Sequence, residues 1–231
     1  MRSVLEEQIE YYRARAAEYD QWFLRQGRYD RGPHLNARWF AQDREVLERL
    51  ESFAPRGAVL ELACGTGIWT ARLAPHAREL IAVDTSPEVI TINRARLQSS
   101  KVTYVETDLF EWTPPVQFDV VFFGFWLSHV PPERFERFWA LVKRALKPEG
   151  RFFFVDSRYE STGTAKDHRL PDRSVTTHIR RLNDGREFQI YKIFYDTVDL
   201  QQRLMQLGWD AELHQTADYF LYGWGRPRPP S

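Results

Sequence analysis

One twelve-residue stretch, residues 59–70, constrains the fold of this chain more than any other segment. An apolar run leads into Gly65 and Gly67, two positions apart, and a helix-compatible segment follows at once. Glycine adopts positive φ readily and has no Cβ, so backbone N–H groups can approach a ligand closely, while a helix start adds free donors and a positive dipole end. The stretch predicts a strand, a tight turn and a helix that hold a nucleotide-like or carboxylate-bearing cofactor.

The spacing within this stretch separates two cofactor classes. A dinucleotide fingerprint has a third small residue that allows close packing of helix on strand, and Thr70 stands at that position. The stretch instead resembles the first motif of the class I S-adenosylmethionine-dependent methyltransferases, an acidic residue followed by small residues at alternate positions. Glu61, Ala63, Gly65 and Gly67 follow that spacing, with Ala63 where many relatives have glycine.

Composition narrows the class of protein further. A chain of 231 residues suits a single α/β domain. The 32 lysines and arginines balance the 32 aspartates and glutamates, without a block of like charge. We therefore expect no nucleic-acid partner and no anionic membrane partner, and a small-molecule substrate is favoured. The oligomeric state is unknown.

The location is predicted from cysteine content and hydropathy. Cys64 is the only cysteine, so no intrachain disulfide can form, which fits a reducing compartment. No apolar run approaches the ~20 residues of a membrane span, and acidic residues interrupt any apolar region near the N-terminus. We expect a cytoplasmic protein.

The N-terminal residues 1–52 are predicted to form a helical cap over the substrate. Residues 4–25 have helical spacing and resemble the first helix of many small-molecule methyltransferases, where a tyrosine before an aspartate lies against the cofactor. The resemblance implies a cofactor contact for Tyr19 and pocket walls for Tyr11 and Tyr12; the alternative is an amphipathic helix that packs its aromatic side on the domain. A second helix is expected over residues 36–50. His34 and Arg38 near its start are candidate substrate contacts or solvated loop residues.

The next two strand ends carry acidic residues. Asp84 ends the predicted strand 79–84, 17 positions beyond Gly67, where a carboxylate can accept both ribose hydroxyls; a simple turn or helix-cap role is the alternative. After strand 101–106, Asp108 and Leu109 match the positions that in the resembled family contact the adenine amine and ring. The cofactor contacts assigned in this way are Tyr19, Glu61, Ala63, Cys64, Gly65, Gly67, Trp69, Asp84, Thr85, Asp108, Leu109, Phe110 and Gly124.

The end of the predicted fourth strand, 118–123, is where chemistry is expected, because open α/β sheets bind ligands beyond their carboxyl ends. The Asn/Asp-Pro-Pro-aromatic tetrad of base and glutamine methylation is absent there, and so is a catalytic cysteine. His129 is a candidate general base, or else a helix cap or a hydrogen-bonding partner on the cofactor side. Gly124 stands where a metal-dependent relative needs a carboxylate, so we predict no metal. Phe125 and Trp126 favour a flat or apolar substrate.

The last third of the chain begins with a polar stretch, residues 157–185, interpreted as an inserted loop over the pocket. Arg158 and His168 in it are candidate substrate contacts, with a solvated surface as the alternative. A strand over 187–195, a helix over 197–207 and a strand over 211–222 are expected to complete the sheet, which leaves 226–231 as a disordered tail.

These features predict one Rossmann-like α/β sandwich whose core spans residues 53–225, with sheet order 3-2-1-4-5-7-6 and strand 7 antiparallel. The resemblance implies a methyltransferase that uses S-adenosylmethionine and releases S-adenosylhomocysteine by in-line displacement. An oxygen of a small aromatic or apolar metabolite of specialised metabolism is the expected acceptor, and a nitrogen is the second choice. The alternatives are a non-catalytic S-adenosylmethionine-binding protein and a nicotinamide-dependent oxidoreductase.

Overall fold

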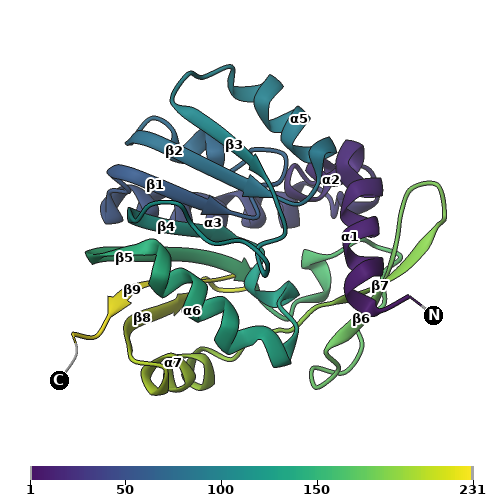
Figure 1. Ribbon diagram of the computed structural model, residues 1–231. Coiled ribbons are helices and arrows are strands. Elements are labelled where there is room, and N and C mark those ends of the chain that lie inside the picture. Colours follow the sequence, from purple (N-terminus) through teal and green to yellow (C-terminus); the bar gives the residue numbers. More distant parts are fainter. Residues whose placement is uncertain (1, 230–231) are drawn as a thin grey trace.

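The computed structural model describes residues 2–229, and its centre is a seven-stranded sheet with the order β3-β2-β1-β4-β5-β9-β8 (Figure 1). The strands from β3 to β5 in this order are parallel, and β9 is antiparallel to both its neighbours. The predicted order, with its antiparallel last strand, is confirmed. The strands are β1 (Gly57–Leu62), β2 (Ala77–Asp84), β3 (Val102–Glu106), β4 (Phe118–Gly124), β5 (Leu146–Ser157), β8 (Trp209–Gln215) and β9 (Phe220–Pro227).

Helices cover both faces of the sheet, which explains why its central strands are apolar on both sides. On one face α3 (Pro33–Phe53) and α4 (Thr70–Leu73) pack against β1, β4 and β5, and α5 (Pro87–Leu97) packs beside α4. On the other face lie α6 (Phe135–Ala145) and α7 (Thr197–Gln206). Ser86 caps α5 and Pro87 is its first residue. No helix within residues 2–229 is long and apolar enough to cross a membrane.

The N-terminal cap is smaller than predicted. The expected helix over 4–25 is divided into α1 (Val4–Arg15) and α2 (Tyr19–Phe23) by a 3-10 turn, Ala16–Glu18. The helix predicted over 36–50 is α3, whose apolar stripe is buried against the sheet, so it belongs to the sheet layer and not to the cap. A capping box of Ser3 and Glu6 fixes the start of α1.

The predicted loop 157–185 contains a strand that was missed, and this strand forms a β-hairpin with the one that follows the loop. The hairpin consists of β6 (Thr177–Arg181) and β7 (Glu187–Tyr191), which pair with each other and not with the central sheet. Figure 1 shows this hairpin beside α1, away from the helices that flank the sheet. The strand predicted over 187–195 was therefore assigned to the wrong sheet.

The C-terminal strands also differ from the expectation. The single strand predicted over 211–222 is the hairpin of β8 and β9, which supply the sixth and seventh strands. Its turn is held by Gln42 of α3, whose side-chain oxygen accepts from the backbone N–H groups of Asp218 and Tyr219 at 2.9 and 3.0 Å. The expected disordered tail is wrong for residues 226–227, which pair with β8, and residues 230–231 lie outside the described part of the chain.

Candidate functional site

A pocket opens at the carboxyl ends of β1, β2 and β4, between the glycine loop and the cap. We call it the cofactor pocket. It brings together most of the residues predicted to contact the cofactor, which come from the glycine loop, three strand ends and the cap. Those residues are Tyr19, Ala63, Gly65, Asp84, Thr85, Asp108, Leu109, Phe110 and Gly124.

Asp84 is the best-defined polar group of the cofactor pocket. Its Oδ2 accepts from the backbone N–H of Gly65 at 2.9 Å, and its Oδ1 accepts from that of Ser86 at 3.0 Å. Each carboxylate oxygen has a second lone pair left for a ligand hydroxyl. A Cβ placed on Gly65 would meet no atom within 4 Å, so the loop leaves open space in front of this carboxylate.

The other predicted cofactor residues, Glu61, Cys64, Gly67 and Trp69, do not line the cofactor pocket. All four are buried and support the conformation of the glycine loop. Gly67 has φ +90°, and a Cβ there would lie 2.5 Å from the side-chain oxygen of Asn93, so only glycine fits. Burial raises the pKa of Glu61 to about 8, and its Oε2 has no hydrogen-bond partner within residues 2–229.

The sequence predicted that the N-terminal helix lies against the cofactor, but it did not identify all the residues of α1 that line the cofactor pocket. Leu5, Gln8 and Ile9 lie in its wall, and so does Val89 of α5. Trp126, predicted to contact substrate, lines the cofactor pocket instead. The helical spacing of Leu5 and Ile9 was a visible signal of one buried face, but it could not show against what that face packs.

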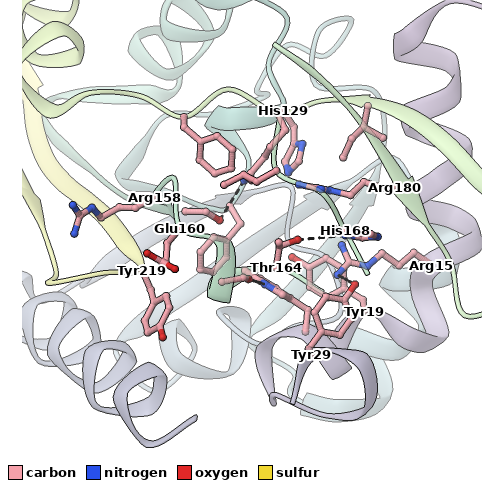
Figure 2. Close-up of a pocket in the computed structure, with 18 of the residues that line it drawn as sticks. Arg15, Tyr19, Tyr29, His129, Arg158, Glu160, Thr164, His168, Arg180 and Tyr219 are labelled. Carbon is pink, nitrogen blue, oxygen red and sulfur yellow. Dashed lines mark hydrogen bonds between the residues drawn. The ribbon is translucent and has the colours of Figure 1, made fainter. Parts of the chain in front are cut away.

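A second pocket adjoins the cofactor pocket, and we call it the cationic pocket because Arg15, Arg180 and Lys192 line it (Figure 2). Aromatic side chains, mainly from the N-terminal helices, form much of the remaining wall, and the segment after β5 adds mostly polar residues, including Glu160. Four side chains line both pockets and form their common boundary: Tyr12, Tyr19, Phe125 and His129.

His129 is buried at this boundary, in the 3-10 turn Leu127–His129 that follows β4. Its Nδ1 lies 2.6 Å from the carbonyl oxygen of Tyr191, and its Nε2 lies 2.8 Å from the hydroxyl of Tyr12. A carbonyl only accepts, so Nδ1 carries the hydrogen and Nε2 is the free acceptor. Burial first, and then the charge of Lys192, hold the pKa of His129 well below its usual range. The imidazole is therefore neutral at pH 7.

Arg15 and Arg180 are buried, and neither forms an ion pair within residues 2–229. Arg15 lies over the ring of Tyr19, 4.8 Å from its centroid, and donates to the hydroxyl of Tyr29 at 3.3 Å. The Nη1 of Arg180 is buried with no partner in the described chain. Lys192, by contrast, is 3.3 Å from Asp156. The two arginines thus supply positive charge that no carboxylate neutralises.

Of the residues predicted to contact substrate, Tyr11, Tyr12, Phe125, Arg158 and His168 line the cationic pocket. The guanidinium of Arg158 donates to backbone carbonyls of the β8–β9 turn, and in Figure 2 it points away from the group formed by Arg15, Arg180 and His168.

His168 and the two residues at the start of α3 differ from their predicted roles. Burial and the charges of Arg180 and Arg28 lower the pKa of His168 to about 3, so it is a neutral wall residue. His34 and Arg38 were predicted to contact substrate, but both are exposed on α3 outside the two pockets, and Arg38 pairs with Asp218 at 2.5 Å.

Comparison with known proteins decides the family. A methyltransferase-domain model matches residues 59–150. The structure of DhpI in complex with SAH is 39% identical in sequence, superimposes with a TM-score of 0.78 and covers 98% of each chain. The chain belongs to the class I S-adenosylmethionine-dependent methyltransferases. Its cofactor is S-adenosylmethionine, because DhpI structures hold SAH in one case and SAM with HEP in another, the latter at 38% identity and a TM-score of 0.81.

Curated relatives match the methyltransferase over shorter stretches. An uncharacterised methyltransferase of Synechocystis is 34% identical over 112 residues, which are 48% of this chain and 51% of that protein. The trans-aconitate 2-methyltransferase of Rhodopseudomonas palustris is 35% identical over 91 residues, 38% of this chain and 34% of that one. The chain thus spans about half, or less, of the length of these curated relatives.

The cofactor pocket of this methyltransferase fits S-adenosylmethionine. Asp84 offers two acceptor oxygens to a diol, the open space at Gly65 admits a ligand against the backbone, and Leu109 and Phe110 supply apolar surface for a base. Within residues 2–229 no group of three or more His, Cys, Asp or Glu side chains is arranged to hold a metal ion.

Proposed function

We propose that this methyltransferase transfers the methyl group to an oxygen of a small acidic molecule held in the cationic pocket. The observation that carries the proposal is the presence of Arg15 and Arg180, buried beside the cofactor pocket without a carboxylate partner in the described chain. Burying an uncompensated charge is costly, so such groups are retained where a ligand of opposite charge completes them. Guanidinium groups suit carboxylate, phosphate or related oxyanions.

The proposed pose of the cofactor follows from the strand ends. Asp84 accepts from the two ribose hydroxyls, and Asp108 accepts from the adenine amine between Leu109 and Phe110. Gly65 lets the backbone approach the ligand, while Tyr19 lies at the boundary with the cationic pocket. Thr85 and Gly124 complete the walls. Four residues act on the cofactor only indirectly, by supporting the glycine loop: Glu61, Cys64, Gly67 and Trp69.

The chemistry needs little from the protein beyond alignment and one proton acceptor. The bound cofactor supplies a methyl group on a sulfonium, which is already activated for displacement. His129 takes the hydroxyl proton of the acceptor on Nε2 as the new O–C bond forms and the S–C bond breaks. The aromatic walls exclude water and hold acceptor and cofactor in contact, an effect that can supply several kcal/mol.

An anionic substrate also suits His129 electrostatically. Besides burial, the charges of Lys192, Arg180 and Arg15 lower the pKa of this histidine. An anion bound between the arginines offsets part of that field, so the pKa of His129 rises toward its usual range when substrate is present. The base is thereby more effective in the complex than in the free enzyme.

The names of two relatives support an acidic substrate. One relative is a trans-aconitate 2-methyltransferase, and another, from Triticum aestivum, is a phosphoethanolamine N-methyltransferase that is 30% identical over 129 residues. These molecules carry carboxylates or a phosphate. The apolar acceptor expected from Phe125 and Trp126 is thus revised to a small acid whose carbon skeleton packs against the aromatic walls.

Two measurements test the proposal in sequence. Calorimetric titration with S-adenosylhomocysteine and with NAD should show binding of the first alone. Methyl transfer from labelled S-adenosylmethionine is then screened over matched pairs of small hydroxylated carboxylates or phosphonates and their neutral amides or esters. Turnover confined to the acids is expected. Turnover of the neutral partners alone contradicts the acidic substrate, and cofactor binding without any turnover favours a non-catalytic S-adenosylmethionine-binding protein.

His129 is tested separately. His129→Gln should retain cofactor binding and lower kcat by about 10²-fold or more, as expected for the loss of a general base. Full turnover by this variant would show that the acceptor needs no base.

A further inference from the structure

We propose that Gln8 of α1 is a positioning residue that fixes His129 in the tautomer with hydrogen on Nδ1 and a free Nε2. The inference rests on the proposed role of His129 as base. It extends that role to a residue with no expected part in the chemistry. Gln8 is 2% exposed, and its amide joins three segments that are far apart in the sequence.

Both ends of the Gln8 amide are engaged. Its Nε2 donates to the carbonyl oxygen of His129 at 3.0 Å, and its Oε1 accepts from the backbone N–H of Tyr191 at 3.0 Å. The same two residues are joined by the bond from His129 Nδ1 to the Tyr191 carbonyl, 2.6 Å long. Gln8 therefore bridges the backbones of the two residues whose contact decides which ring nitrogen is protonated.

The hairpin side of this arrangement is anchored to the sheet by a buried ion pair. Lys192 donates to Ser128 Oγ at 2.7 Å and to Asp156 Oδ1 at 3.3 Å. Asp156 Oδ2 also accepts from the backbone N–H of Ser128 at 2.8 Å. Ser128, next to His129, and Lys192, next to Tyr191, are thus both bound to Asp156 at the end of β5. Gln8 adds a second connection between the same two segments, from the side of α1.

The position of Gln8 makes the arrangement depend on the cap. Gln8 lies on α1, which also supplies Tyr12 to Nε2 of the same imidazole. When α1 packs on the hairpin, it completes the walls of both pockets and at the same time fixes the ring of His129. The orientation of the base therefore depends on the packing of α1 against the hairpin.

The chain offers a matched control one residue away. Glu7 of α1 accepts from the backbone N–H of Gln189 on β7 at 2.8 Å, so it also ties the helix to the hairpin, but it does not contact His129. Glu7→Met therefore removes one bond between α1 and the hairpin and leaves His129 untouched, whereas Gln8→Met removes a bond to the hairpin together with the bond to His129. Gln8 also lines the cofactor pocket, and methionine, which is of similar length, conserves its bulk there.

The test is ring ¹⁵N NMR of the full-length protein with S-adenosylhomocysteine bound, with the signals of His129 assigned by their loss in His129→Gln. We expect one neutral tautomer in the wild type and in Glu7→Met. Gln8→Met should show mixed tautomers and a ring that titrates nearer its ordinary pKa, and kcat should fall by about 10-fold, a larger change than that in S-adenosylhomocysteine affinity. Gln8→Glu keeps an acceptor for Tyr191 but loses the donor to His129, so it should show an intermediate effect.

Two results overturn the proposal: ring signals of Gln8→Met identical to those of the wild type, or Glu7→Met changing them equally. Neither depends on turnover. A different experiment tests whether His129 is the base: full methyl-transfer activity of His129→Gln would show that it is not.

Discussion

The hydroxyl oxygen of Tyr12 lies 2.8 Å from Nε2 of His129, on the boundary that the cofactor pocket shares with the cationic pocket. Because Nδ1 donates to the Tyr191 carbonyl, the Tyr12 hydroxyl donates to Nε2 and occupies the lone pair that a substrate hydroxyl would need. In the proposed mechanism a substrate hydroxyl therefore has to displace the Tyr12 hydroxyl from Nε2, or share it.

Tyr12→Phe tests this relationship. The variant leaves a buried ring nitrogen without its donor, so we expect the free energy of unfolding to fall by about 1–2 kcal/mol. Turnover should fall less than in His129→Gln, because the base remains. Urea unfolding and methyl-transfer assays measure the two effects. Tyr159→Phe is the control, since the exposed Tyr159 hydroxyl bonds only to the Pro171 carbonyl. Equal stability of the two variants would contradict the assigned contact.

The proposed contact of Asp84 with the ribose predicts a large loss of cofactor affinity in Asp84→Asn. The amide keeps the shape of the side chain but loses the charge, and one of its ends can no longer accept from a hydroxyl. We expect S-adenosylhomocysteine to bind about 10- to 100-fold more weakly by calorimetry. Glu106→Gln is the control, because Glu106 is in register with Asp84 on β3 but is exposed outside the pocket. Unchanged affinity in Asp84→Asn would reject the ribose assignment.

The cofactor side of the fold could be predicted because its signals are local. A glycine loop, an acid at a strand tip and a proline at a helix start each impose their geometry within a few residues, and Asp84, Asp108 and Gly65 all lie in the cofactor pocket as expected.

The strands of the C-terminal third could not be assigned to their sheets in this way. The alternating residues of β7 fit any half-buried strand, and alternation does not say whether the partner is β6 or the central sheet.

The cationic pocket was missed for a related reason. Arg15 and Arg180 stand among other charged residues, where a solvated surface is the usual outcome. They are buried because α1 packs against the β6–β7 hairpin, which lies more than 160 positions further along the chain. A contact between such distant segments leaves no local pattern, so the sequence could offer the arginines of residues 157–185 as candidate anion contacts but could not show that Arg180 meets Arg15 in one pocket.

Glu61 gives a prediction about pH. Burial raises its pKa to about 8, so the folded protein holds a proton that the unfolded chain releases near pH 4.5. A raised carboxyl pKa contributes stability that is fully present below pH 4.5 and is lost as the pH rises toward 8. Glu61→Gln should therefore gain stability relative to the wild type as the pH rises through this window, by up to about 1.4 kcal/mol per pH unit.

Urea unfolding of the cofactor-free protein between pH 5 and 9 measures this difference. Glu79→Gln is the control, because Glu79 is an exposed carboxylate on β2. Parallel stability curves for the wild type and Glu61→Gln would show that Glu61 is charged in the folded protein at neutral pH.

Arg180 predicts a conflict between stability and function. Its buried guanidinium has no carboxylate partner in the described chain, and burial lowers its pKa. Arg180→Met removes an uncompensated charge while conserving apolar bulk, so we expect the free energy of unfolding of the substrate-free enzyme to rise by about 1–3 kcal/mol. The same variant should lose binding of acids, because half of the proposed anion site is gone.

Thermal unfolding with and without inorganic phosphate measures both the stability of Arg180→Met and its loss of anion binding. Phosphate should raise the Tm of the wild type in proportion to its occupancy of the anion site and should leave that of Arg180→Met unchanged. Arg181→Met is the control from the same strand, because Arg181 is exposed and its ion pair with Glu187, 2.7 Å long, contributes little to stability. If phosphate stabilises Arg180→Met as much as Arg181→Met, the anion does not bind between Arg15 and Arg180, and an acidic substrate loses its structural basis.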